Sequence, residues 1–183
     1  MRIIAGQFRG RTLASVGKGD KGGHLRPTTD RVRESLFSML IHLDVIDGAR
    51  VLDLFAGTGA LGLEALSRGA RHVTFVDDGR VANELIRQNI DLTQSGDQTR
   101  VIRRDVLKLG PCVDDPFDLV FLDPPYGKGL GFKAIDVVRA GGWLAKDTLI
   151  VCEENAPLEV PPGFDLEDRR KYGSTFVTLL RLH

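Results

Sequence analysis

The chain has 183 residues, of which 42% are hydrophobic and 27% are charged, and its formal net charge is zero. These totals are those of an ordinary globular protein with one substantial core. The longest apolar runs are too short for a transmembrane helix, and residues 1–6 lack the apolar stretch of a signal peptide. We therefore expect a cytoplasmic protein with no membrane partner.

The two cysteines, Cys112 and Cys152, stand far apart in the chain, and the four histidines show no ligand spacing near them. This pattern favours reduced thiols and predicts no metal site. The sequence requires nothing larger than a monomer.

Positive charge is concentrated at the start of the chain. Residues 1–37 hold eight Lys or Arg against three Asp or Glu, whereas residues 38–183 hold 17 against 22. A basic block on an acidic body favours contact with a polyanion over a merely solvated basic tail.

The first elements form an extension before the main alternating pattern. Residues 2–8 and a second short run through Thr12 and Leu13 predict a small β-hairpin, followed by a Gly/Lys loop at 15–23. Thr29 or Asp30 can cap a helix that runs to about His42.

Strands then alternate with helices, which predicts a mostly parallel sheet covered on both faces. The helix at 80–92 would carry Val81, Leu85 and Leu92 on its apolar side, and the last two strands read as a hairpin about residues 172–174. The predicted strands are 50–54, 72–76, 101–102, 117–122, 148–152 and two within 164–182, with further helices to about 68 and over about 132–139.

A glycine turn follows the first of these strands. Gly57, Gly59 and Gly62 match the pattern G-x-G-x-x-G, whose glycines allow a sharp turn and close approach of a ligand. Asp53 would repel a pyrophosphate but suits a cationic amine such as that of S-adenosylmethionine (AdoMet). A tight turn without a ligand is the alternative interpretation.

Four acids lie at or just past the carboxyl ends of predicted strands: Asp53, Asp77, Asp105 and Asp123. Ligands of open α/β sheets bind at that edge. Asp77, with Asp78 as its neighbour and competitor, can accept from ribose hydroxyls. Asp105 can accept from an adenine amine with Val106 as an apolar contact, or it can instead cap a helix.

The sequence Asp123-Pro124-Pro125-Tyr126 follows a buried strand. The prolines remove two donors, so the Asp123 carboxylate and the Pro124 carbonyl leave an acceptor-rich rim. Two acceptors can bind both hydrogens of an exocyclic amine and turn its lone pair toward a methyl donor. Tyr126 offers a ring on which a base can stack.

The segments 53–59 and 123–126 together resemble AdoMet-dependent amino-methyltransferases of nucleic acids. With segments 26–37 and 2–11 added, the chain is similar to the bacterial small-subunit ribosomal RNA guanine-N2 methyltransferases of the RsmD type, over essentially its whole length. The glycine turn alone is unspecific, and the amino-terminal block is the part specific to that family.

The resemblance implies a Rossmann-like, seven-stranded methyltransferase fold in a single domain over residues 1–183, with an extension at 1–44 and an AdoMet-binding core at 45–183. It implies methylation of the N2 amine of one guanine in small-subunit ribosomal RNA, with that RNA or an assembly intermediate as partner. The implied catalytic residues are Asp123, Pro124, Pro125 and Tyr126; the cofactor contacts are Asp53, Phe55, Gly57, Gly59, Asp77, Asp105 and Val106; the RNA contacts are Arg26, Arg31, Arg33 and Tyr126.

Other functions stay open at this point. A DNA adenine-N6 methyltransferase would use the same acceptor rim, although the chain has no spare length for a target-recognition region. A nicotinamide-dependent oxidoreductase would share the glycine pattern, but Asp53 and the double proline argue against it. A protein-glutamine methyltransferase and an inactive RNA-binding assembly factor are the remaining alternatives.

Overall fold

The computed structural model describes residues 1–16 and 28–183. Its helices are α1 (Asp30–His42), α2 (Ala60–Ser67), α3 (Arg80–Thr93) and α4 (Leu130–Ala140), with the short 3-10 helices η1 (Gly96–Gln98) and η2 (Val106–Lys108). Its strands are β1 (Arg50–Leu54), β2 (His72–Asp77), β3 (Thr99–Arg103), β4 (Phe117–Leu122), β5 (Leu144–Glu154), β6 (Phe164–Tyr172) and β7 (Thr175–Leu182). The predicted alternation of strands and helices is confirmed.

The strands form one sheet in the order β3-β2-β1-β4-β5-β7-β6. β1 pairs in parallel with β2 and β4, whereas β7 runs antiparallel to β5 and β6. The chain moves outward from β1 to β3 and then returns to β4 on the other side of β1. Strand order therefore reverses between β1 and β4, and the crevice beyond their carboxyl ends is where such sheets bind ligands.

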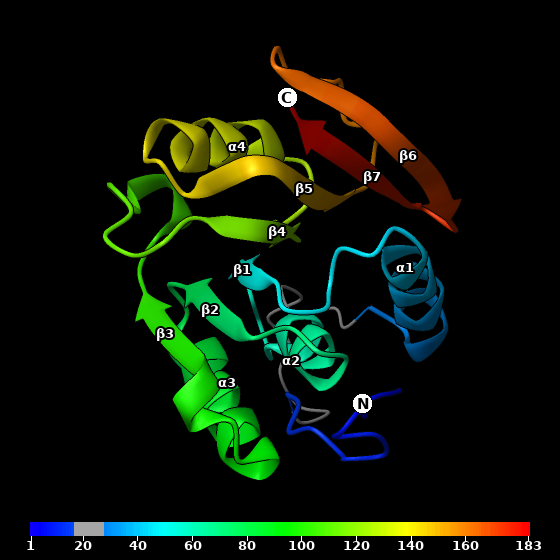
Figure 1. The fold of residues 1–183 in the computed structure, drawn as a ribbon, viewed down its shortest axis with the longest axis vertical. Coiled ribbons are helices and arrows are strands. Elements are labelled where there is room, and N and C mark those ends of the chain that lie inside the picture. The colour runs from blue at the N-terminus through cyan, green and yellow to red at the C-terminus, as the bar shows by residue number, and fades with distance from the viewer. Residues whose placement is uncertain (17–27) are drawn as a thin grey trace.

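Helices cover both faces of the sheet (Figure 1). α1, α2 and α3 contribute Leu36, Leu63 and Ile86 to one apolar cluster, whereas α4 contributes Ile135 to a second cluster on the opposite face. Side chains of successive strand residues alternate between these clusters, as the pleat requires. Ile3 lies in the first cluster, so the extension and the sheet share one core.

The predicted amino-terminal hairpin is present in a short form: Arg2 and Thr12 form an antiparallel bridge, the amide of Ile3 donates to the Arg11 carbonyl, and the amide of Leu13 donates to the Met1 carbonyl. The amides of Ile4 and Ala5 donate to the side chain of Glu64 on α2, at 2.9 and 3.1 Å. The Glu64 carboxylate therefore holds the hairpin against α2 through charge-assisted hydrogen bonds.

α1 begins where the sequence predicts, because the Thr29 side chain accepts from the amide of Val32. The predicted apolar side of α3 is wrong. Val81 is 49% exposed and Leu92 is 38% exposed, whereas Ile86 and the polar Asn89 are buried. Asn89 bonds the backbone of Ala14 and Thr58, and these bonds fix which side of α3 faces inward.

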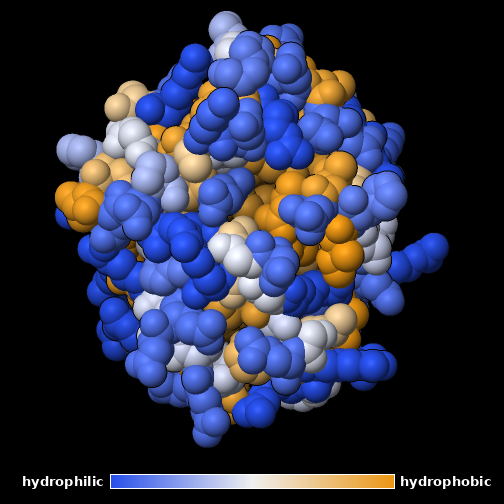
Figure 2. Space-filling model, in the orientation of Figure 1, coloured by the Kyte–Doolittle hydropathy of each residue, from blue (hydrophilic) through white to orange (hydrophobic). Residues whose placement is uncertain are grey.

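Hydrophilic residues cover most of the face seen in Figure 2, and apolar residues gather in a smaller area of it. Among the helices of residues 1–16 and 28–183, none is long and apolar enough to cross a membrane.

Candidate active site

A cavity of about 490 Å³ opens at the crevice between β1 and β4. This volume is within the range of small-molecule sites. Its wall combines the amino-terminal segment, the start of α1, the glycine turn and the rim beyond β4. The site residues predicted from the sequence that line it are Asp53, Phe55, Gly57, Arg33, Asp123, Pro124, Pro125 and Tyr126.

The glycine turn joins β1 to α2 through left-handed backbone. Phe55, Gly57 and Gly59 have φ values of 56°, 59° and 78°. This conformation is easy for glycine but costs a residue such as Phe55 about 1–2 kcal/mol. Strain of this kind is concentrated at functional sites, and here it bends the chain around the cavity.

Asp53 lies at the bottom of the cavity and is only 2% exposed. Its Oδ2 accepts from the amide of Gly62 on α2 at 2.9 Å. Burial raises the pKa of Asp53 to about 8, although the Gly62 bond acts in the opposite direction. A buried carboxyl of this kind favours a cationic partner, because a positive charge would stabilise its ionised form.

Asp77 and Asp105 lie outside the cavity lining. Asp77 accepts from the amides of Gly57 (3.0 Å) and Gly79 (2.8 Å), which ties the end of β2 to the glycine turn. Burial raises its pKa. Asp105 accepts from the amide of Leu107 and caps η2, the competing role that the sequence also allowed. Their contacts with ribose and adenine stay predictions.

Val106 was predicted as an apolar contact for a cofactor. It is 2% exposed and packs in the second apolar cluster, outside the cavity lining. As for Asp105, a contact of Val106 with the cofactor stays a prediction; its side chain packs in the core beyond the end of β3.

The Asp123-Pro124-Pro125-Tyr126 segment forms the rim beyond β4. Burial is the main cause that raises the pKa of Asp123 well above its ordinary value, and the negative charge of Glu153 adds to it. Tyr126 is 36% exposed, and its hydroxyl lies 3.3 Å from Glu153 Oε1 and 3.2 Å from Thr175 Oγ1. The ring is therefore held in place while one side of it stays accessible.

Glu153, which the sequence analysis missed, lies outside the cavity lining but contacts two side chains that belong to it, Thr28 and Tyr126. Leu122 pairs with Cys152 in the parallel register of β4 and β5, so Asp123 and Glu153 are the next residues along neighbouring strands. Glu153 Oε2 accepts from the Thr28 hydroxyl at 3.1 Å, and burial raises the pKa of Glu153. The sequence offered an acid directly after the predicted strand 148–152, but it does not encode the register of β5 with β4 that brings Glu153 beside Asp123.

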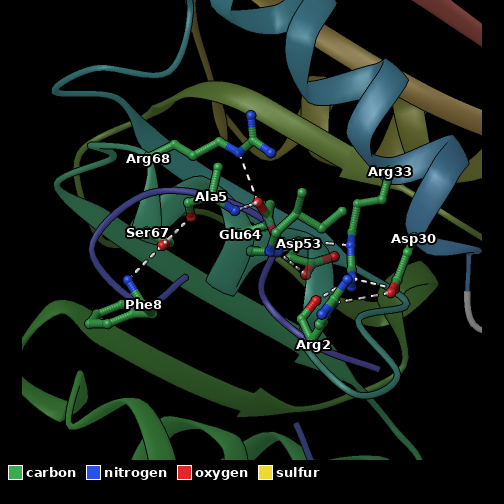
Figure 3. Close-up of polar contacts among 11 residues, drawn as sticks. Arg2, Ala5, Phe8, Asp30, Arg33, Asp53, Glu64, Ser67 and Arg68 are labelled. Atoms are coloured by element: carbon green, nitrogen blue, oxygen red, sulfur yellow. Dashed lines mark hydrogen bonds and ion pairs between the residues drawn. The ribbon is translucent and has the colours of Figure 1, made fainter. Parts of the chain in front are cut away.

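The three predicted RNA-contacting arginines differ in position. Arg26 lies outside the described residues, and Arg31 is exposed. Arg33 is fully buried, which contradicts a direct contact with RNA. Figure 3 shows its side chain extending from α1 toward Asp30, Arg2 and the buried Glu64. These partners hold Arg33 inside the protein, although the sequence analysis expected it among the RNA contacts.

The family described as conserved hypothetical protein 95 matches residues 1–181. A relative from Escherichia coli strain K12, named ribosomal RNA small subunit methyltransferase D, is 40% identical over 176 residues, which cover 94% of this chain and 85% of that protein. A relative of the same name from Haemophilus influenzae is 41% identical over 179 residues, covering 94% and 89%.

A solved structure shows the same similarity. The candidate methyltransferase yhhF from Escherichia coli has a TM-score of 0.85 and 37% identity to this chain, covering 100% of this chain and 98% of that one. The agreement spans both the amino-terminal extension and the sheet.

Proposed function

This chain belongs to the family of conserved hypothetical protein 95, the RsmD family of methyltransferases, and on that premise we propose that it transfers a methyl group from AdoMet to the N2 amine of a guanine in small-subunit ribosomal RNA. One observation carries this proposal: the acceptor rim at Asp123 and the buried Asp53 line the same cavity. A methyl donor and an exocyclic amine could therefore be held side by side.

The β1 side of the cavity fits the methionyl end of the cofactor. Asp53 would bind its ammonium, and the turn at Gly57 and Gly59 lets the backbone approach closely. When bound, AdoMet supplies an electrophilic methyl group on its sulfonium. Asp77 and Asp105 remain the proposed partners of the ribose and the adenine.

The β4 side of the cavity fits the target amine. Asp123 and the Pro124 carbonyl would accept from the two N–H groups and turn the nitrogen lone pair toward the methyl group. Bound AdoMet would supply the methyl group and keep the electron pair of its carbon–sulfur bond on sulfur, while Asp123 and Pro124 hold the amine in line with that bond. The raised pKa of Asp123 makes its carboxylate an effective acceptor for the proton that the amine then loses. Positioning supplies much of the remaining barrier reduction.

Glu153 favours guanine over adenine at this rim. The edge of guanine next to N2 offers three N–H groups, two from the amine and one from N1, whereas adenine offers two N–H groups and a lone pair. Asp123 and Glu153 place two carboxyls together, and Glu153 bonds two side chains of the cavity wall, Thr28 and Tyr126. Carboxylates attract the N1 hydrogen of guanine and repel the N1 lone pair of adenine.

The outer part of the site fits RNA. Tyr126 would stack on a base taken out of its helix, which contributes about 1–3 kcal/mol per base. Lys128 is an exposed cation at this rim, and Arg31 is an exposed cation at the start of α1. Both would contact phosphates.

The test is methyl transfer by the purified protein from labelled AdoMet to naked small-subunit RNA, to assembly intermediates and to duplex DNA, with the products digested to nucleosides. We expect N2-methylguanosine, loss of at least about 100-fold in rate for Asp123→Ala, and no change for the exposed Asp136→Ala. N6-methyladenine in DNA as the product would instead support the adenine alternative. No product from any substrate contradicts both.

A further inference from the structure

The Arg33 guanidinium is only partly satisfied inside the protein. Its Nη2 donates to the Arg2 carbonyl and to Asp30 Oδ1. Its Nη1 and Nε are buried and make no hydrogen bond with the described residues. A buried charged donor without a partner costs stability, so such groups in native proteins call for an explanation.

The surrounding carboxylates do not supply the missing partner. Glu64 already accepts from the amides of Ile4 and Ala5 and from Arg68 Nε, the last at 2.8 Å. Arg33 Nε stands 3.9 Å from Glu64, beyond hydrogen-bond distance. Asp30 binds only Nη2 and is half exposed. Arg33 therefore keeps two donors without a hydrogen bond among the described residues, while Nη2 is bonded to its neighbours (Figure 3).

Arg33 belongs to the wall of the cavity that also holds Asp53 and the first residues of α2, Ala60 and Leu61. The cavity lining thus includes a buried carboxyl and a buried guanidinium. An amino-acid group, with its ammonium and its carboxylate on one carbon, has the charges that such a pair would bind. The guanidinium is planar and presents forked donors, which suit a carboxylate.

We propose that Arg33 binds the carboxylate of the methionyl group of AdoMet, opposite the ammonium held by Asp53. The proposal rests on the proposed function, since it assigns a further contact to the same cofactor. Arg33 is then a cofactor-binding residue and not a contact for RNA. An RNA phosphate is the less favoured anion, because Arg33 lines the cavity that also holds Asp53, whereas Arg31 on the same helix is exposed at the surface.

Isothermal titration calorimetry tests this without any catalytic turnover. The ligands are AdoMet and decarboxylated AdoMet, which keeps the amine and the sulfonium but lacks the carboxylate. The wild-type protein should bind AdoMet about 10- to 100-fold more tightly, the factor expected of a charged hydrogen bond. Arg33→Met should lose that preference: its affinity for AdoMet falls, whereas its affinity for decarboxylated AdoMet stays near the wild-type value.

The matched control is Arg31→Met, which removes an exposed arginine from the same helix and should keep the full preference for AdoMet. Arg33→Lys should keep a smaller preference, because an ammonium is a single point of charge without the fork. Circular dichroism and thermal melting establish that each variant is folded. Should Arg33→Met not fold, the wild-type and Arg33→Lys ratios still decide.

Three results overturn the proposal: equal affinity of the wild-type protein for both ligands, an unchanged ratio in Arg33→Met, or an equal loss for both ligands in that variant. Failure of the proposed function is distinguishable, because it is read from the nucleoside products: a wild-type protein that prefers AdoMet but forms no N2-methylguanosine keeps the Arg33 contact and loses the guanine assignment, whereas one that binds neither ligand loses both.

Discussion

Asp53 Oδ2 accepts a 2.9 Å hydrogen bond from the amide of Gly62, which joins the end of β1 to the first turn of α2. The contact fixes the glycine turn between them and points a buried carboxyl into the cavity. Burial raises the pKa of Asp53 to about 8, which means that the ionised carboxylate is destabilised inside the protein. A cationic ligand beside it would stabilise that ionised form.

Asp53→Asn should stabilise the protein by an amount that grows with pH. A folded-state pKa of about 8 lies above the ordinary value of 3.8, so the wild-type protein loses stability as pH rises between these values. Asparagine keeps an acceptor for Gly62 but does not titrate. Its advantage in the free energy of unfolding should increase by on the order of 1–3 kcal/mol between pH 5 and pH 8.

Denaturant unfolding of the wild-type protein and of Asp53→Asn at the two pH values measures this difference. The other buried carboxyls are present in both proteins, so their contributions to the free energy of unfolding cancel. Asp78→Asn, at an exposed position, should show no such growth. A constant difference for Asp53→Asn across this range would contradict the assignment. The same variant should bind AdoMet more weakly, since it loses the partner of the ammonium.

Gly62→Ala should destabilise the protein by about 1–3 kcal/mol through overpacking. A Cβ at this position would lie 2.4 Å from Phe75 Cε1, 2.7 Å from Val73 Cγ1 and 3.0 Å from Asp53 Oδ2. Gly96→Ala is the control, because a Cβ there meets nothing within 4 Å. Equal midpoints of chemical denaturation for the two variants would show that α2 can move away from β2 freely.

Glu153→Gln should move the pH dependence of methyl transfer to lower pH. The account requires ionised Asp123 as an acceptor, so the rate rises as Asp123 loses its proton. The charge of Glu153 adds to the raised pKa of Asp123, after burial, and Glu154 contributes less. Rate measurements against pH should therefore give a larger shift for Glu153→Gln than for Glu154→Gln. A larger shift for Glu154→Gln than for Glu153→Gln would show that the group whose titration controls the rate is not Asp123.

Glu64→Ala should cost about 3–5 kcal/mol, because it leaves Arg68 and two backbone amides inside the protein without their acceptor. The exposed pair Arg80–Glu84 has the same spacing along a helix, and Glu84→Ala should cost about 0.5 kcal/mol or less. Equilibrium denaturation distinguishes the two. A small effect for Glu64→Ala would mean that the amino-terminal segment does not depend on this carboxylate.

The residues that the sequence located best are those whose position follows from strand order. Parallel strands end at one edge of the sheet, so Asp53 and Asp123 could be brought to one site from their places at the end of β1 and directly after β4. The third glycine of the turn, Gly62, likewise packs against β2, as its spacing indicates. Local patterns sufficed because neighbouring residues determine these positions.

Arg33, Glu153 and the buried side of α3 could not be located in this way. Arg33 is buried by partners on the amino-terminal segment and on α2, including Glu64 far along the chain. Glu153 joins the site through the register of β4 with β5. Asn89 is turned inward by bonds to the backbone of Ala14 and Thr58. Each depends on tertiary contacts that composition and periodicity do not encode.

The measurement that tests the central claim most directly is a nucleoside map of ribosomal RNA from cells with and without this gene, read by digestion and mass spectrometry. The account predicts the loss of N2-methylguanosine at one small-subunit position, restored by the wild-type gene and not by Asp123→Ala. An unchanged guanosine profile in the small-subunit RNA of the deletion strain would contradict it.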